Sequence, residues 1–196
     1  MSWYDNWWKL QHIPSCNNKI SKTLYIIRSI KNTLPTKYLR TLYQTLIQPH
    51  IEYGIIIWGA THESYINKLN VLQKKAIRII SNAKYNEHTS PLFKKLKLLK
   101  LNDIYELHLG KFMYKATHNQ LQPALAHYFP LNIEIHNYST RQAGNPQIKL
   151  RRTTKASFQI NYKGPVYWQD LPNDIKQSIT IKQFTSKLKN NLVHNY

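Results

Sequence analysis

Residues 41–80 read TLYQTLIQPHIEYGIIIWGATHESYINKLNVLQKKAIRII, and the spacing of their apolar residues decides the fold. In the second half of this stretch, apolar residues recur every three or four positions, which is the spacing of one face of a helix. They are Ile66, Leu69, Leu72, Ala76 and Ile79. Thr61 is a suitable N-cap residue just before them, and Glu63 would lie in the first turn. The pattern predicts an amphipathic helix over about residues 62–81.

The same spacing continues on both sides of this stretch. Apolar stripes predict helices over about residues 17–32, 38–47 and 102–118. Between the last two, Ser90 followed by Pro91 is typical of a helix start and opens a short basic helix. We therefore expect a bundle of about five helices in residues 17–120, after a connector in residues 1–16.

Beyond residue 120 the apolar periodicity of the sequence is lost, because prolines and glycines interrupt every periodic run. They are Pro123, Pro130, Gly144, Pro146, Gly164, Pro165 and Pro172. Residues 157–162 alternate polar and apolar side chains, which predicts a short strand with residues 147–150 as its candidate partner. A final amphipathic helix is predicted from about Thr180. The expected fold class is mainly α, with an irregular α+β region in residues 121–196.

The charge of the chain favours an acidic partner. The 196 residues include 28 Lys and Arg but only 9 Asp and Glu, which gives a formal net charge of +19. Nucleic acid is the commonest partner of so basic a protein. An A/T-rich coding sequence would also enrich Lys, but it would not deplete Asp and Glu. We therefore predict contact with nucleic acid.

Three basic clusters are candidate phosphate contacts. The first is on the predicted helix 62–81, the second follows Ser90, and the third is in the irregular region. They are Lys68, Lys74, Lys75 and Arg78; Lys94, Lys95, Lys97 and Lys100; and Arg141, Arg151, Arg152 and Lys155. Such contacts position a duplex without reading its sequence. The alternative is that these side chains are ordinary solvated charges.

No group of residues indicates catalysis or a metal. The nine acids are dispersed, whereas two-metal phosphoryl chemistry needs carboxylates that converge on the ions. Asp170 and Asp174 flank a proline, which is typical of turn and cap residues. Cys16 is the only cysteine, so a secreted disulfide scaffold is excluded, and no apolar run reaches the roughly 20 residues of a membrane span. We predict no enzyme activity, cofactor, metal or membrane partner.

The motifs of residues 41–80 closely resemble the segment that follows the palm in reverse transcriptases of jockey-like non-LTR retrotransposons. The shared motifs are Leu42–Tyr43, Pro49, Tyr53–Gly54, Trp58–Gly59 and Leu72–Arg78. Shorter matches extend the resemblance over about residues 8–192; among them are Trp8, Lys19–Lys22, Tyr138–Arg141, Gly164, Trp168, Leu171–Pro172 and Phe184. We interpret Tyr53–Gly54 as a close approach of helices, and Trp58 and Trp168 as core residues.

This resemblance implies the C-terminal part of an RNA-directed DNA polymerase. The Tyr/Phe-x-Asp-Asp turn that holds the catalytic metals is absent, and it would lie upstream of Met1. The chain would comprise the thumb, which grips the primer–template duplex, and the region after it. Its partners would be an RNA–DNA hybrid or duplex and the upstream palm, and its location the nucleus. The alternatives are a helical module that binds a protein or an acidic surface, and a decayed copy without function.

Overall fold

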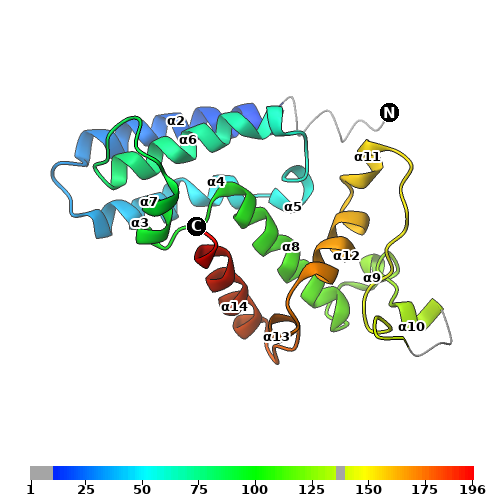
Figure 1. Cartoon of the computed structure of the whole chain (residues 1–196). Coiled ribbons are helices and arrows are strands. Elements are labelled where there is room, and N and C mark those ends of the chain that lie inside the picture. The colour runs from blue at the N-terminus through cyan, green and yellow to red at the C-terminus, as the bar shows by residue number, and fades with distance from the viewer. Residues whose placement is uncertain (1–10, 136–139) are drawn as a thin grey trace. The chain divides into compact units, whose positions relative to one another are not determined.

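The computed structural model describes residues 11–135 and 140–196, and this part of the chain is mainly helical (Figure 1). The predicted mainly α class is therefore confirmed. Two residues that contribute to the sequence resemblance, Trp8 and Tyr138, lie outside the described residues. The helices are α2 (Ile13–Ile30), α3 (Thr36–Leu46), α4 (Gln48–Glu52), α5 (Ile55–Trp58), α6 (Glu63–Ile80), α7 (Ser90–Leu96), α8 (Leu101–Thr117), α9 (Pro123–Ala126), α10 (Asn132–Ile135), α11 (Thr154–Ser157), α12 (Ile160–Asp170), α13 (Asn173–Lys176) and α14 (Ile181–His194).

The prediction of strands at residues 147–150 and 157–162 is wrong, because the described residues contain no strand. Residues 147–150 are irregular, and α11 and α12 occupy most of the second segment. Gln159 is the N-cap residue of α12, and the helix continues through Pro165 in its interior. Six alternating residues are too few to separate a strand from the start of a helix. The finer description of a five-helix bundle followed by an irregular α+β region is not confirmed.

The packing divides the chain into two compact units. Unit 1 comprises Met1–Ile104 together with Leu192–Tyr196, and unit 2 comprises Tyr105–Asn191. The boundary expected near residue 120 was drawn from composition, whereas these units are drawn from packing, so that boundary remains a prediction.

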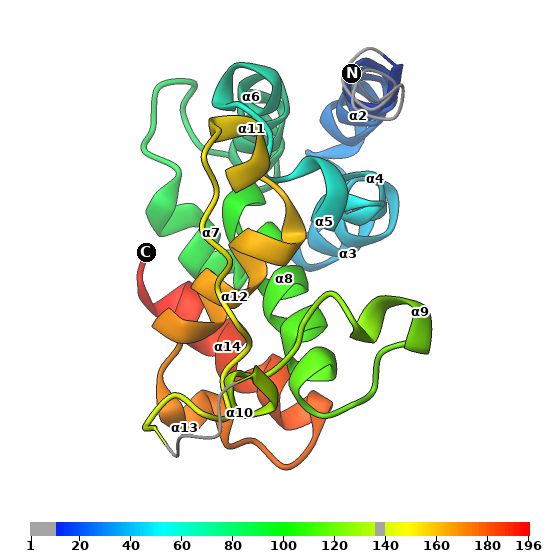
Figure 2. The same cartoon turned by 90° about the vertical axis from the view of Figure 1, so that its right-hand side faces the viewer.

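Unit 1 is organised around α2 and α6, which lie side by side (Figure 2). Helices α3 and α4 pack against α2, and α7 packs against α6. Three residues of the predicted apolar stripe of α6 are buried, whereas Leu72 and Ile79 are only half-buried. The buried face of α6 consists of Ile66, Leu69, Gln73, Ala76, Ile77 and Ile80. Its N-cap residue is His62 rather than the predicted Thr61, and Glu63 lies in the first turn as expected.

The start of α8 is held by a polar residue within this apolar core. The Gln73 side chain of α6 accepts a hydrogen bond from the backbone N–H of Leu101 (2.9 Å). Its amide nitrogen donates to the Tyr43 hydroxyl (2.9 Å) and to the carbonyl of Leu99 (3.0 Å). A free N–H at a helix start needs such a partner when it is buried. Gln73 therefore ties α3, α6 and α8 together.

Unit 2 is built on close contacts between helices at two glycines. A Cβ atom on Gly110 of α8 would lie 2.6 Å from Leu188 Cδ2 of α14, and one on Gly164 of α12 would lie 2.5 Å from Met113 Sδ. The rings of Tyr114 and Phe184 are 4.9 Å apart between centroids. The Tyr114 hydroxyl donates to the carbonyl of Ser178 (2.9 Å). Small residues at these positions let α8, α12 and α14 enclose one core.

Candidate nucleic-acid interface

The first predicted basic cluster lies mainly on the exposed side of α6. Lys68, Lys74 and Lys75 are all exposed, while the opposite face of the helix is buried in unit 1. Lys68 and Lys75 are seven residues apart, so they project from the same side of the helix. No Asp or Glu occurs between Glu63 and Glu87. The burial of one face thus leaves these three ammonium groups towards solvent, in a stretch of sequence without an acidic residue.

Arg78, the fourth member of this cluster, has a structural contact. It is half-buried, and its Nε donates a hydrogen bond to the carbonyl oxygen of Glu87 (2.9 Å). The Glu87 carboxylate in turn accepts a hydrogen bond from the backbone N–H of Lys84 (3.2 Å). Arg78 therefore holds the loop between α6 and α7 in addition to contributing positive charge.

The second cluster also contains both lysines open to solvent and lysines with structural contacts. Lys95 and Lys97 are exposed, and Lys97 ends α7 in the left-handed conformation, with φ of 52°. The ammonium of Lys94 lies 3.4 Å from the carbonyls of both His194 and Tyr196. The ammonium of Lys100 lies 4.1 Å from the centroid of the Tyr196 ring, a cation–π contact. Two of the four lysines thus contact the C-terminal residues of unit 1.

The third cluster belongs to unit 2, whereas the first two belong to unit 1. Arg141 and Arg152 are exposed, and Arg151 is half-buried. The Nε of Arg151 is buried without a hydrogen-bond partner among the described residues. Lys155 lies in α11, and its side chain is outside the described part of the structure.

The motif residues around α5 form a turn, and the close approach of helices at Tyr53–Gly54 stays a prediction. Gly54 has a φ of 65°, a left-handed conformation that favours glycine, and it lies between α4 and α5. Tyr53 before it is 66% exposed. The Trp58 side chain is buried, and its Nε1 donates to the carbonyl of Tyr53 (2.8 Å). Gly59 is the C-cap residue of α5 and donates its N–H to the carbonyl of Ile55 (2.7 Å).

The motif residues of unit 2 have structural positions. Trp168 is buried, with its ring centroid 5.8 Å from that of Phe184. Pro172 is the N-cap residue of α13. Both tryptophans thus lie in the core, as the sequence analysis expected.

The thiol of Cys16 is buried and is not activated as a nucleophile. Cys16 Sγ lies 3.4 Å from His12 Nε2 and donates to the carbonyl of His50 (3.4 Å). Burial raises the pKa of the Cys16 thiol and lowers the pKa of the His12 imidazole. Both groups are therefore kept neutral, whereas a nucleophilic cysteine needs a thiolate. In residues 11–135 and 140–196, no three His, Cys, Asp or Glu residues gather as metal ligands, and no helix is long and apolar enough to cross a bilayer.

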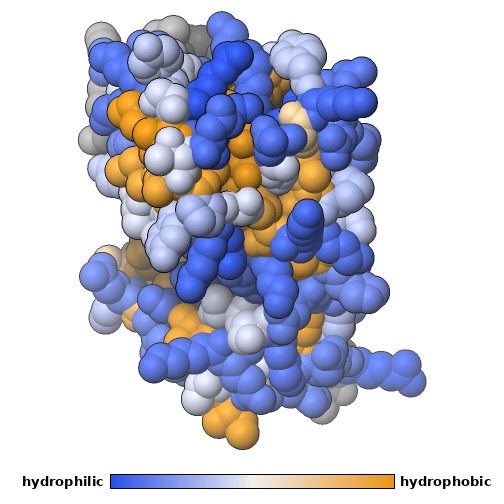
Figure 3. Space-filling view, turned by 90° about the vertical axis from the view of Figure 1, so that its left-hand side faces the viewer, coloured by the Kyte–Doolittle hydropathy of each residue, from blue (hydrophilic) through white to orange (hydrophobic). Residues whose placement is uncertain are grey.

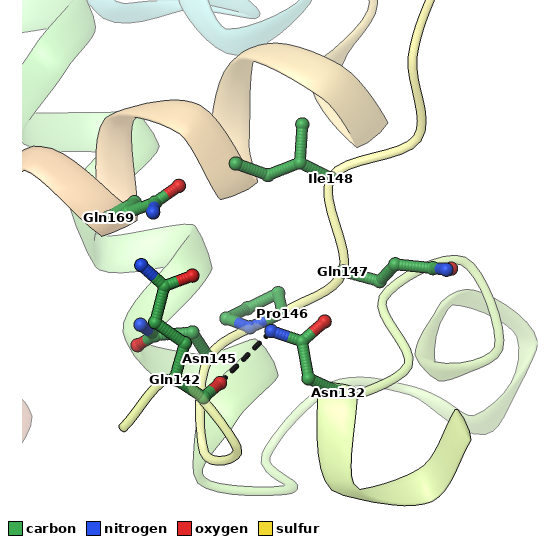
Figure 4. Close-up of a pocket in the computed structure, with 7 residues that line it drawn as sticks. All are labelled: Asn132, Gln142, Asn145, Pro146, Gln147, Ile148 and Gln169. Carbon is green, nitrogen blue, oxygen red and sulfur yellow. Dashed lines mark hydrogen bonds between the residues drawn. The ribbon is translucent and has the colours of Figure 1, made fainter. Parts of the chain in front are cut away.

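A small cavity in unit 2, shown in Figure 4, was not predicted from the sequence. Its volume is about 280 Å³, and carboxamide side chains dominate its lining. The lining residues are Asn132, Gln142, Asn145, Pro146, Gln147, Ile148 and Gln169. They come from α10, from the segment after Thr140 and from the end of α12. No periodic pattern joins them, because the fold alone brings these three segments together.

Comparison with known proteins agrees with the sequence resemblance. The chain is 28% identical over 95 residues to the RNA-directed DNA polymerase from mobile element jockey of Drosophila melanogaster. It is 26% identical over 94 residues to the probable RNA-directed DNA polymerase from transposon X-element of the same species. The corresponding protein from mobile element jockey of Drosophila funebris is 30% identical over 94 residues.

These matches cover about half of the chain, 48% in each of the three cases. The chain spans about a tenth of the length of these curated relatives. This coverage fits a fragment of a reverse transcriptase from a non-LTR element. No family model and no solved structure matches the chain.

Proposed function

We propose that this chain is a thumb-like fragment of a jockey-like reverse transcriptase that binds a nucleic-acid duplex through its phosphates. The observation that carries this proposal is the set of exposed lysines on α6, Lys68, Lys74 and Lys75, outside its buried face. The similarity to RNA-directed DNA polymerases supplies the class of ligand. The primer–template duplex is the substrate that such a fragment would hold.

Electrostatics supports contact with phosphates rather than with bases. Lysine ammonium groups are point charges that satisfy phosphate oxygens without reading a sequence. Each phosphate neutralised releases condensed counterions, so the affinity falls with increasing salt. With about six phosphates neutralised, we expect the affinity to fall roughly 10³-fold between 50 and 200 mM salt.

The test is fluorescence anisotropy of a labelled RNA–DNA hybrid at these two salt concentrations. A variant with Lys68→Gln, Lys74→Gln and Lys75→Gln should bind more weakly and should reduce the salt slope by about 2 to 3. The matched control removes three exposed lysines elsewhere, by Lys22→Gln, Lys37→Gln and Lys182→Gln. Equal weakening by both variants, or an affinity no higher than that of a basic peptide of equal charge, contradicts the proposal.

The fragment is proposed to have no polymerase activity of its own. The described residues contain no group of three carboxylate, histidine or cysteine ligands that would hold a catalytic metal. Phosphoryl transfer in polymerases depends on two such ions. A primer-extension assay with the purified chain should give no extended product. Extension activity that co-purifies with the chain would overturn this part of the proposal.

A second candidate function is docking of a protein partner, which the exposed apolar side chains of unit 1 favour. Tyr25 and Ile26 on α2 are 77% and 52% exposed, and Ile57 on α5 is 64% exposed. Figure 3 shows hydrophobic side chains lying open between hydrophilic ones on one face of the molecule. A preference for an acidic peptide over a duplex of equal charge would favour this function over duplex binding.

A further inference from the structure

We infer that the carboxamide-lined cavity of unit 2 binds one unstacked nucleobase of a single-stranded nucleic acid. The cavity lies entirely within unit 2, between the segment after Thr140 and the end of α12. This inference rests on the proposed function only in taking nucleic acid as the ligand. It adds a second, separate site, away from the lysines of α6 in the sequence and in a different unit.

The wall of the cavity is held in place by hydrogen bonds between the segment after Thr140 and residues 130–132. The side chain of Asn132 donates from Nδ2 to the carbonyl of Gln142 (2.9 Å), the dashed line in Figure 4. The backbone N–H of Asn132 donates to the carbonyl of Asn145 (3.0 Å), and that of Gln147 to the carbonyl of Pro130 (2.9 Å). These bonds fix the segment after Thr140 against α10. The site is therefore formed before any ligand arrives, which lowers the cost of binding.

Three amides of this wall are available to a ligand. In Figure 4, the side-chain amides of Gln142, Asn145 and Gln169 lie on one side of the cavity, while Gln147 points away from them. Asn145 and Gln169 are half-buried. Within residues 11–135 and 140–196, no hydrogen bond engages any of these three amides. Each carboxamide offers one acceptor oxygen and two donor hydrogens.

The chemistry of the lining selects the ligand. Adjacent donors and acceptors on a carboxamide match the edge of a nucleobase, and Asn or Gln pairs with adenine in this way. Pro146 and Ile148 are the apolar residues of the lining and can contact the face of the ring. The volume of about 280 Å³ lies near the lower end of small-molecule sites, which suits one base rather than a stacked pair.

The surrounding charge favours a ligand that carries phosphate and disfavours a metal cation. Residues 135–169 contain six Lys and Arg and no Asp or Glu. The two acids that flank this range are Glu134, which accepts a hydrogen bond from the backbone N–H of Leu131 (3.1 Å), and Asp170, which is exposed. Arg141, next to Gln142, is exposed and can meet the phosphate of the bound nucleotide. A pocket lined by uncharged side chains, in a segment with more cations than acids, fits a base attached to a charged backbone.

The first experiment compares two single-stranded heptanucleotides with the wild-type chain, by anisotropy at 50 mM salt. One carries a central adenine, and the other carries an abasic site there, so that their charge is identical. We expect the adenine strand to bind about 10-fold more tightly. RNA and DNA versions of both strands show which sugar is preferred. Equal affinity for the adenine and abasic strands overturns the inference, and this comparison needs no variant.

The second experiment locates the base. Gln142→Ala combined with Asn145→Ala should abolish the preference for adenine over the abasic site, while Gln120→Ala, an exposed carboxamide of unit 2 outside the cavity, should retain it. Circular dichroism checks that the double variant is folded. If the variant unfolds, a photoreactive adenine in the wild-type complex should cross-link within residues 142–148 or to Gln169. Cross-links confined to other segments overturn the inference.

The outcomes for the two sites are separable. If the cavity variant loses the adenine preference but still binds the hybrid as the wild type does, only the cavity site has been affected. If the α6 lysine variant loses hybrid binding but keeps the adenine preference, only the duplex site has been affected.

Discussion

The phenol of Tyr196 donates a hydrogen bond to the carboxylate of Asp103, 93 residues earlier in the chain. The same hydroxyl accepts a hydrogen bond from the backbone N–H of Lys100 (2.8 Å). The Tyr196 ring also meets Phe93 edge-on, with centroids 6.2 Å apart. Burial raises the pKa of Asp103 in spite of the hydrogen bond from Tyr196, and burial and Asp103 raise the pKa of the phenol.

This pair makes stability depend on pH in a defined direction. Because the pKa of Asp103 in the folded state lies above its ordinary value of 3.8, the folded state binds the proton more tightly. Its contribution to stability is complete below pH 3.8 and is lost as the pH rises through the folded pKa. Asp103→Asn, which stays neutral, should therefore gain in free energy of unfolding relative to wild type as the pH rises from 3 to 7. Urea titrations at several pH values measure this difference.

The control for this experiment is Asp174→Asn, which removes an exposed carboxylate on α13. Its stability relative to wild type should change less with pH than that of Asp103→Asn. A difference between Asp103→Asn and wild type that stays constant from pH 3 to 7 would show that Asp103 has the same pKa in both states.

Replacement of Gln73 should be among the more damaging substitutions in unit 1. Gln73→Met keeps the size of the side chain but leaves the Tyr43 hydroxyl, the Leu99 carbonyl and the Leu101 N–H without this partner. Unpaired buried groups of this kind cost roughly 1–3 kcal/mol each, so we expect a loss of about 3 kcal/mol in the free energy of unfolding. Denaturant titration measures the loss. Asn67→Ala, at an exposed position on the same helix, should change the stability by less than about 0.5 kcal/mol.

A methyl group at Gly110 should destabilise unit 2. The Cβ of Gly110→Ala would lie 2.6 Å from Leu188 Cδ2, and Leu188 is fully enclosed with 1% of its surface exposed. Overpacking costs about 1–3 kcal/mol, which exceeds the gain of up to about 1 kcal/mol from the better helix propensity of alanine. Thermal unfolding should show a lower midpoint for this variant. Gly144→Ala is the matched control, because nothing lies within 4 Å of its Cβ position.

Arg78 and Lys75 should differ in their effect on stability although both carry positive charge on α6. Arg78→Gln loses the hydrogen bond from Nε to the Glu87 carbonyl, at a cost of about 1 kcal/mol. Lys75→Gln removes an exposed charge and should leave stability within about 0.5 kcal/mol of wild type. Amide hydrogen exchange should increase in residues 84–87 of the Arg78 variant only. Increased exchange in both variants would mean that charge, and not this hydrogen bond, orders the loop.

Local patterns predicted α2, α3, α6, α7, α8 and α14, because burial of one face selects a period of three to four residues. The periodic run around Leu69 and Ala76 became α6, and Ser90–Pro91 became the start of α7. Pro165 was expected to interrupt regular structure, but it lies inside α12. Proline statistics describe an isolated helix, whereas tertiary packing decides this one: Gly164 and Pro165 are both buried.

The candidate sites were only partly accessible to sequence reasoning. Exposed lysines on α6 follow from its amphipathic pattern, since residues opposite a buried face must meet solvent. The hydrogen bond from Arg78 to the carbonyl of Glu87, nine residues later, depends on the conformation of a loop. The cavity around Gln142 and Gln169 joins segments that are distant along the chain. Contacts between such distant segments depend on tertiary structure, which the local spacing of residues in the sequence does not specify.

The return of Leu192–Tyr196 to unit 1 makes unit 2 an insertion within it. During translation, the ribosome must produce the whole of unit 2 before the contact between Lys100 and Tyr196, 96 residues apart, can form. Closing a loop of this length carries an entropic cost that rises with the logarithm of its length. Unit 1 thus reaches its final state only after its insertion has been made, and a protease that cuts within residues 118–122 would leave its two parts on separate polypeptides, joined by noncovalent contacts alone.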